Sequence, residues 1–450
     1  MPQPEESSMH AASQPESTEA EPGTDGRLYP ATTTQTKRLA LLQGPDRWWK
    51  NPYVWAYSYP GRLDVPRMEQ ALRLVARRHS GLRLYFFPDS IDTVGCIPPG
   101  EATWPLREMT AGADPAAADA EAYAWLQDMF APFERPLLRA VVLHRPESDM
   151  FGVSIEQSIL DHAGAMALFD DITKVYDGLA DRPASAFDEL VTDATRFALD
   201  ERAWFAGDDG AESLAWWDEH NKGLGAYPGL DLPELGPCEP WGEIINYDLQ
   251  LSADDTARLK QYARRLRVTT TMLAFAATAV TLRAHGHSGD VRFLFATSRR
   301  IWPGTEKLIG YFSNRMMLRI PVTVEDTVPS LAPKVRSGVL DAISHSMFSH
   351  EEYVRARYPD AYDREPTGYG YVNTAVYDPA PRLGGVPLTR ESLPMFGKDF
   401  HQPGLALALF LYGDRPAVAN ASCAEGMYTR EFVETITRDF ARTCVGTTGE

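Results

Sequence analysis

The part of this chain that most constrains its fold is an apolar run followed by a short polar loop and a long amphipathic helix. The run covers residues 151–155 (Phe-Gly-Val-Ser-Ile), and the loop covers residues 156–162 (Glu-Gln-Ser-Ile-Leu-Asp-His). In the helix that follows, apolar residues recur at the spacing of one buried face: Met166, Phe169, Ile172, Val175 and Tyr176. The segment therefore predicts a strand, a polar loop and a helix that ends near Tyr176.

Helix and strand signals alternate on both sides of this unit. Residues 34–42 form a short amphipathic segment, and residues 54–59 alternate aromatic and small side chains as a strand does. Residues 64–79 begin with Asp-Val-Pro and end with Arg-Arg-His, the charge order that stabilises a helix. A strand is expected at 82–87, and an Ala-rich, core-buried helix at 272–283. The pattern predicts a mixed α/β chain.

Several segments, in this order, resemble motifs of the condensation domains of nonribosomal peptide synthetases, members of the chloramphenicol-acetyltransferase-like superfamily. The segments are residues 63–83, 131–140, 151–162, 293–300 and 308–319. The resemblance extends over about residues 28–447. It implies an α/β fold of two chloramphenicol-acetyltransferase-like lobes, which form a V-shaped pseudo-dimer around a central tunnel. The lobes are expected at residues 27–195 and 196–447, with a Pro/Gly-rich crossing segment at 228–240.

Charge and composition exclude several classes of protein. The net charge of −18 argues against a nucleic-acid-binding protein, which needs a basic surface. Residues 1–26 carry six carboxylates and no Lys or Arg, so we expect a disordered acidic tail there, without the pattern of a signal peptide. No apolar run reaches the roughly 18 residues of a membrane span. The cysteines (Cys96, Cys238, Cys423 and Cys444) lack CxxC spacing, so we expect buried or free thiols in a cytoplasmic protein.

The polar loop departs from the family motif where the family's chemistry lies. Condensation domains carry His-His-x-x-x-Asp-Gly here, and their second His acts as the base of acyl transfer. In this chain Glu156 and Gln157 occupy the two His positions, Asp161 occupies the Asp position and His162 replaces the Gly. The resemblance thus predicts the fold of the loop without its usual base.

Three residues are expected to maintain the fold. In the family, the Asp of the motif pairs with an Arg of the other lobe, and the corresponding residues here are Asp161 and Arg300. A buried carboxylate needs such a partner, because an unpaired buried charge is strongly destabilising. Asn314 lies in the segment that resembles a further family motif, and we group it with this structural pair.

Gln157 and His162 are the first two catalytic candidates. A glutamine amide donates and accepts hydrogen bonds but takes no proton at neutral pH. Gln157 would therefore orient a nucleophile or stabilise a developing oxyanion, or else only satisfy backbone groups at the strand end. His162 is the one imidazole of the loop and could serve as a relocated base, although a His at a helix start is more often a cap or surface residue.

Glu156 is the third candidate, as a charged helper. Its spacing from Asp161 is similar to the DxxxxD pattern of heterocyclisation domains, and the loose counterparts of their C-terminal residues are Ser392 and Asp399. His285 and His287 could suggest a metal site, but with no third ligand nearby we expect a solvated loop.

Two functions remain open from the sequence. In the first, the chain serves antibiotic or other natural-product biosynthesis as an acyltransferase. It acts in trans on an acyl or aminoacyl thioester that a carrier protein presents on phosphopantetheine, and forms an amide or ester bond or a ring. In the second, it is an inactive module that recruits a carrier protein or a tailoring enzyme. In both cases we expect a monomer with no bound cofactor or metal, and no nucleic-acid or membrane partner. The polar side chains of the loop favour the enzyme.

Overall fold

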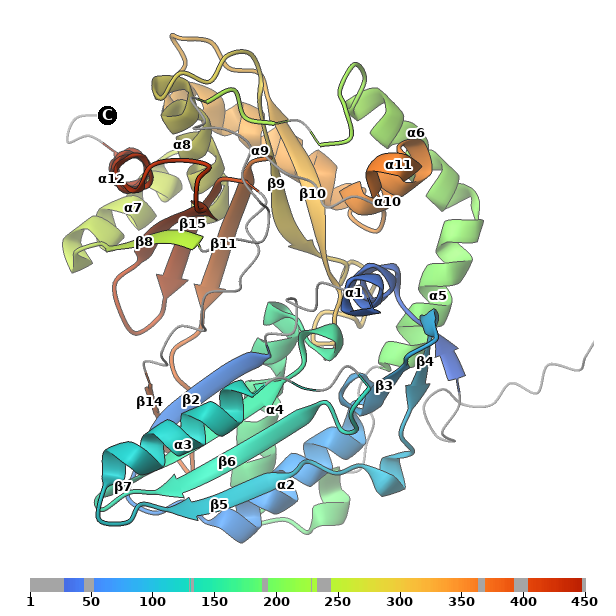
Figure 1. The fold of residues 1–450 in the computed structure, drawn as a ribbon, viewed down its shortest axis with the longest axis vertical. Helices are drawn as coiled ribbons and strands as arrows, with labels where there is room; N and C mark the ends of the chain where they lie inside the picture. Colours follow the sequence, from blue (N-terminus) through green and yellow to red (C-terminus); the bar gives the residue numbers. More distant parts are fainter. Residues whose placement is uncertain are drawn as a thin grey trace, which may run out of the picture.

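The computed structural model describes residues 28–43, 52–128, 130, 133–187, 193–227, 229–232, 244–362, 369–391 and 404–446. The chain forms two α/β lobes, one mainly from the N-terminal half and one from the C-terminal half (Figure 1). The predicted mixed α/β architecture is therefore present. The predicted acidic tail at 1–26, most of the crossing segment at 228–240, and Ser392 and Asp399 lie outside the described residues.

The N-terminal lobe is built on a five-stranded sheet in the order β14-β2-β7-β6-β5. Its strands are β2 (Tyr53–Pro60), β5 (Leu106–Thr110), β6 (Leu138–His144), β7 (Ser148–Ile155) and β14 (Thr389–Arg390). Helices α2 (Val65–Arg78) and α4 (His162–Gly178) pack on one face, and α3 (Pro115–Gln127) packs on the other. The β6 and β7 strands are buried on both faces, which explains their continuous apolar sequence.

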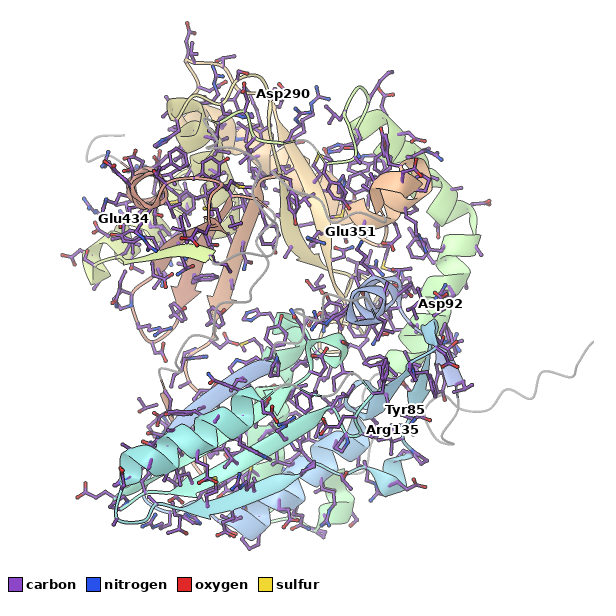
Figure 2. All side chains as sticks on the ribbon, viewed as in Figure 1. Tyr85, Asp92, Arg135, Asp290, Glu351 and Glu434 are labelled. Carbon is purple, nitrogen blue, oxygen red and sulfur yellow. The ribbon has the colours of Figure 1, made fainter. Side chains whose placement is uncertain are left out.

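A smaller sheet, in the order β1-β4-β3, lies beside this lobe. Its strands are β1 (Leu28–Pro30), β3 (Leu84–Phe87) and β4 (Ser90–Cys96), and helix α1 (Thr33–Gln43) follows β1. The strand predicted to begin at residue 82 begins at Leu84 instead, because residues 80–83 form a 3₁₀ turn in which the Leu82 amide donates to the His79 carbonyl. Figure 2 shows Tyr85 of β3 beside Arg135, whose guanidinium lies 3.4 Å from the ring centroid.

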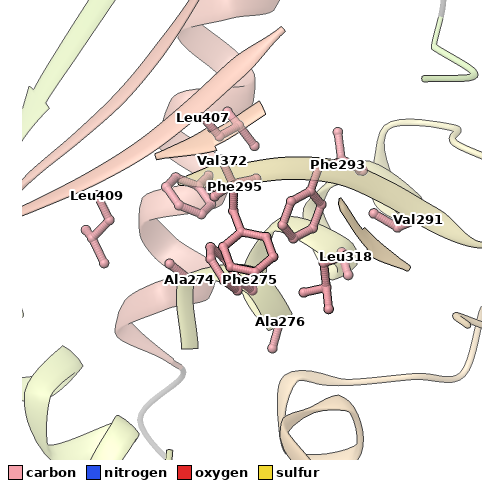
Figure 3. Packing of buried hydrophobic residues seen from close by; sticks show 14 of the residues in the cluster. Ala274, Phe275, Ala276, Val291, Phe293, Phe295, Leu318, Val372, Leu407 and Leu409 are labelled. Atoms are coloured by element: carbon pink, nitrogen blue, oxygen red, sulfur yellow. The ribbon is translucent and has the colours of Figure 1, made fainter. Parts of the chain in front are cut away.

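The C-terminal lobe contains a six-stranded sheet in the order β10-β9-β11-β15-β16-β8. Its strands are β8 (Ile244–Gln250), β9 (Val291–Ser298), β10 (Ser313–Ile320), β11 (Tyr371–Tyr377), β15 (Ala406–Tyr412) and β16 (Val418–Ala424). Its longer helices are α7 (Ala253–Arg265), α8 (Thr270–Ala284), α9 (Val328–Ser344) and α12 (Arg430–Val445). The predicted Ala-rich helix is α8, whose Phe275 packs against Phe293 and Phe295 in the core (Figure 3).

Two helices connect the lobes on one side of the molecule, α5 (Ala194–Ala206) and α6 (Asp208–His220) (Figure 1). Trp217 of α6 is fully buried and donates from its indole nitrogen to the Phe348 carbonyl, 2.9 Å away. The lobe boundary predicted between residues 195 and 196 falls in the first turn of α5 and stays a prediction. The remaining short elements are η2 (Pro99–Glu101), η4 (Ala184–Phe187), α10 (His350–Arg357), α11 (Pro359–Tyr362), β12 (Arg382–Leu383) and β13 (Val386–Pro387).

A segment of the C-terminal half crosses back to complete the N-terminal sheet. Strand β14 pairs antiparallel with β2, and Glu391 follows directly after it. The Glu391 carboxylate accepts hydrogen bonds from Arg145 at 2.7 Å, from Tyr123 at 3.0 Å and from Ser58. These three donors keep the pKa of Glu391 below its usual value against the opposing effect of burial. The segment that contains β14 is thus anchored by strand pairing and by charge.

None of the helices within the described ranges is long and apolar enough to cross a membrane.

A buried histidine is expected to make the stability pH-dependent. His350 of α10 is inaccessible, its Nε2 donates to the Ala226 carbonyl at 2.8 Å, and burial lowers its pKa to about 4. Because the folded pKa lies below the unfolded value, this contribution is present above about pH 6.5 and is lost as pH falls toward 4. We expect the free energy of unfolding to fall by about 2 kcal/mol more between pH 7 and 5 than in a His350→Gln variant.

Denaturant unfolding of both proteins at the two pH values measures this difference directly. Equal pH dependence of the two proteins would show that His350 is not the group responsible.

Candidate functional site

Of the loop predicted at residues 156–162, residues 156–161 lie between β7 and α4, and His162 is the first residue of α4. Glu156 caps the short 3₁₀ helix η3 (Gln157–Ile159), and Asp161 caps α4. Each cap carboxylate accepts hydrogen bonds from the backbone amides that begin the following helix. The two carboxylates therefore hold the backbone of the loop in place, and this structural role does not depend on any part in a reaction.

Glu156 is buried and paired with Arg38 of α1. Their closest atoms, Nη2 and Oε1, lie 3.2 Å apart, and 5% or less of either side chain is exposed. The same carboxylate accepts from the amides of Gln157 and Ser158 and from the Ser158 hydroxyl. If the Glu156 carboxylate took up a proton, it would lose its ion pair with Arg38. These contacts therefore favour a positioning role for Glu156.

Helix α1 supplies a second contact that holds the loop in place, and the sequence did not indicate it. Gln35 lies three residues before Arg38, and its Nε2 donates to the Ser158 carbonyl at 3.1 Å. Both side chains are buried. The sequence shows only that Gln35 and Arg38 lie three residues apart, on one face of a short helix. Their burial and their partners are set by the tertiary fold.

Asp161 joins the two lobes. Both of its oxygens lie 2.8 Å from Arg300 nitrogens, in a bidentate pair that is almost fully buried. The amides of Gly164 and Phe312 donate to the same carboxylate at 2.7 and 2.8 Å, and the Asp161 amide donates to the Gly310 carbonyl. The predicted contact between Asp161 and Arg300 is therefore present, within a wider set of bonds between α4 and the loop before β10.

Asn314 lies in β10, away from the polar loop. Its side-chain amide donates to the Ser346 carbonyl and so connects β10 to the segment after α9. The side chain is buried. The structural role expected for Asn314 stays a prediction.

Gln157 contacts a tyrosine that the sequence did not single out. Its Nε2 donates to the Tyr53 hydroxyl at 3.0 Å. Burial, together with Tyr311 and Asp161, raises the pKa of Tyr53 well above its usual value, so the phenol keeps its proton at neutral pH. Because the Tyr53 oxygen accepts from Gln157, its own proton remains for another acceptor. The polar loop and β2 therefore place one amide and one phenol side by side.

His162 contacts the C-terminal lobe. Its Nε2 lies 3.2 Å from the Val376 carbonyl, and its ring stands edge-on to Tyr377 with 4.7 Å between centroids. A carbonyl only accepts, so Nε2 donates the hydrogen of this contact, and in the neutral form of the ring Nδ1 is an acceptor. Of the loop side chains, His162 is the one that could accept a proton without breaking a buried ion pair.

A buried ion cluster next to Arg300 was also missed. Arg299 pairs with Glu201 of α5 and, at 3.1 Å, with Glu352 of α10. It also donates to the Thr33 hydroxyl, and these groups are nearly inaccessible. Two successive arginines directly after β9 thus hold different parts of the fold together. Arg300 contacts the polar loop, and Arg299 contacts the helices α5 and α10.

The expectation of a solvated loop at His285 and His287 is wrong for His287. That side chain is buried, accepts from the Asp231 amide through Nδ1, and lies 3.1 Å from the Asp290 carbonyl through Nε2. His285 pairs with Asp439 at 3.0 Å. Within the part of the chain that the structure describes, no three His, Cys, Asp or Glu side chains form a group that could hold a metal ion.

The sequence of this chain matches a known family model and two curated proteins. The family model described as the condensation domain matches residues 27–361. Tyrocidine synthase 3 of Brevibacillus parabrevis is 27% identical over 342 residues, which cover 72% of this chain and 5% of that protein. Phosphinothricin tripeptide synthetase PhsB of Streptomyces viridochromogenes is 26% identical over 339 residues, which cover 71% of this chain and 28% of that protein. This chain therefore spans under a third of these relatives.

Solved structures resemble the whole described fold. The condensation domain from Monacolin K polyketide synthase MokA has a TM-score of 0.75 at 18% identity, covering 92% of this chain and 97% of that one. The X-domain in complex with OxyB from teicoplanin biosynthesis has a TM-score of 0.72 at 18% identity, covering 97% and 94%. At this identity the likeness concerns the fold alone, and it confirms the predicted chloramphenicol-acetyltransferase-like fold class.

Proposed function

This chain belongs to the condensation-domain family, and on that premise we propose that it transfers an acyl group in the biosynthesis of a peptide or related natural product. Its substrate is an acyl or aminoacyl thioester, presented in trans on the phosphopantetheine of a carrier protein. One relative named above is a tripeptide synthetase, which supports this substrate class. The observation that carries the proposal is the arrangement of the polar loop. Ion pairs with Arg38 and Arg300 hold Glu156 and Asp161 in place. Gln157, which is uncharged, is in no ion pair, and its amide can donate a hydrogen bond to a substrate.

The chemistry that fits these side chains relies on positioning and polarity. An amine attacks the thioester carbonyl, the carbon–nitrogen bond forms, and the carbon–sulfur bond breaks. The proton lost by the amine is taken up by the departing thiolate, so the balanced products are an amide and a free thiol. In this proposal the Gln157 amide and the Tyr53 hydroxyl donate to the carbonyl oxygen as its charge develops, and His162 orients the nucleophile through Nδ1.

A second function is favoured by one specific observation. Both loop carboxylates are fully engaged in structural contacts, and Gln157 cannot take a proton. A domain of this fold that had stopped catalysing would keep these same contacts. The alternative proposal is therefore an inactive module that recruits a carrier protein or a tailoring enzyme.

Reconstitution separates the two proposals. We expect that adding the purified chain to an acyl-loaded carrier and an acceptor-loaded carrier will move the acyl mass from the first carrier to the second, as followed by intact-protein mass spectrometry. Omitting the chain is the control. If the chain binds the loaded carrier but no mass moves across a panel of acyl groups, the recruitment proposal is favoured.

A further inference from the structure

The C-terminal lobe carries a cavity outside the polar loop. Its volume is about 320 Å³, and it lies between α7 and the last residues of β11 and β15. Apolar side chains, including Ala263, Val268 and Leu411, form part of its wall. Sites for small molecules are concave and mostly apolar, and volumes of this size lie at the lower end of their range.

Two cations of α7 line one side of this cavity. Lys260 and Arg264 are four residues apart, so they lie one above the other on the same helix face. Neither forms an ion pair with another residue that the structure describes. Asp378 is the one carboxylate among the lining residues. The side chains around the cavity therefore carry one net positive charge, concentrated on one helix.

Two stacked rings complete the wall. Tyr377 and Tyr412 lie 4.9 Å apart at an interplanar angle of 10°. The Arg415 guanidinium lies 3.8 Å from the Tyr412 ring centroid, and the other end of the stack meets His162 edge-on. These contacts fix the rings in place, so the cavity has a rigid aromatic side beside the candidate site.

We propose that this cavity binds a small carboxylate with an apolar body. The carboxylate would accept from Lys260 and Arg264, and the body would lie against Val268, Leu411 and Tyr377. The two cations favour an anionic ligand over a neutral one. The apolar wall disfavours a small, strongly hydrated anion. Binding of such a ligand does not require that the chain catalyse acyl transfer, so it is tested separately.

Isothermal titration calorimetry of the full chain with 3-phenylpropanoate measures this binding. We expect a saturable, one-to-one isotherm. Acetate, which lacks the body, and 3-phenylpropanamide, which lacks the charge, should each bind at least about tenfold more weakly. The double variant Lys260→Ala/Arg264→Ala should lose at least about tenfold in affinity for 3-phenylpropanoate.

The matched control removes two other cations from the same helix, Arg258→Ala/Arg265→Ala, neither of which lines the cavity. Its affinity should stay within about twofold of the parent, because it loses the same net charge as the first variant without losing a cation that lines the cavity. The contacts it removes, to Asp255 and to the Tyr262 ring, are not made by residues that line the cavity. Equal losses in the two double variants, equal binding of the amide, or no saturable binding of 3-phenylpropanoate would each overturn the proposal.

Discussion

Replacing Asp161 by alanine is expected to lower the free energy of unfolding by about 3–5 kcal/mol, or to leave the protein insoluble. The change leaves Arg300 as an uncompensated charge in a site where only 4% of its side chain is exposed. It also removes the acceptor for the Gly164 and Phe312 amides and the cap of α4. Denaturant unfolding of the soluble variant, or of Asp161→Asn if the alanine variant is insoluble, gives the value.

The chain offers a matched control for this prediction. Asp218 and Arg357 form a bidentate pair with both distances at 2.7 Å, but about two-fifths of each side chain is exposed. Asp218→Ala should therefore cost only about 0–1 kcal/mol. A double-mutant cycle on Asp161 and Arg300 isolates the coupling between them. A fully soluble Asp161→Ala variant with unchanged stability would show that this pair does not hold the lobes together.

Replacing Gln157 by alanine is expected to lower turnover in the carrier assay by about 10²–10³, the loss that follows removal of one donor to developing charge. The Gln157 side chain contributes no buried charge, so the variant should unfold at nearly the parent denaturant concentration. Restoring His at this position need not increase turnover, because a reaction without a base at residue 157 is not limited by proton removal there. Single-turnover rates of both variants test this.

Two comparisons separate chemistry from folding in this prediction. Gln250→Ala removes the same side chain from the exposed end of β8 and should leave turnover unchanged. Tyr53→Phe removes the hydroxyl that accepts from Gln157 and should lower turnover, while keeping the ring. If Gln157→Ala turns over at the parent rate, Gln157 is not part of the reacting site.

The sequence predicted the parts of this site that follow from local order along the chain. The apolar run, the polar loop and the amphipathic spacing up to Tyr176 correspond to β7, η3 and α4. The family resemblance placed Arg300 opposite Asp161, and they lie 2.8 Å apart. Such features are readable because strand and helix periods, and a motif with fixed spacing, are written in consecutive residues.

The environments of individual side chains could not be predicted in the same way. Glu156 was proposed as a charged helper, but its partner Arg38 lies 118 residues away. Arg299 reaches Glu201 and Glu352, which are 98 and 53 residues away, whereas the family motif drew attention only to the neighbouring Arg300. Whether a polar residue stabilises the fold or takes part in a reaction depends on its tertiary partners. No local sequence pattern encodes those partners.

Catalysis by this chain is tested by the amount of pathway product that cells make with each variant in place of the parent chain. The variant to use is Gln157→Ala/His162→Ala, with Glu156 left in place because its loss would unpair Arg38. If these two side chains act in catalysis, this variant, expressed at the parent level, lowers the product as far as deletion of the whole chain does. Full product from the double variant, together with none from the deletion, would contradict catalysis and leave recruitment as the function.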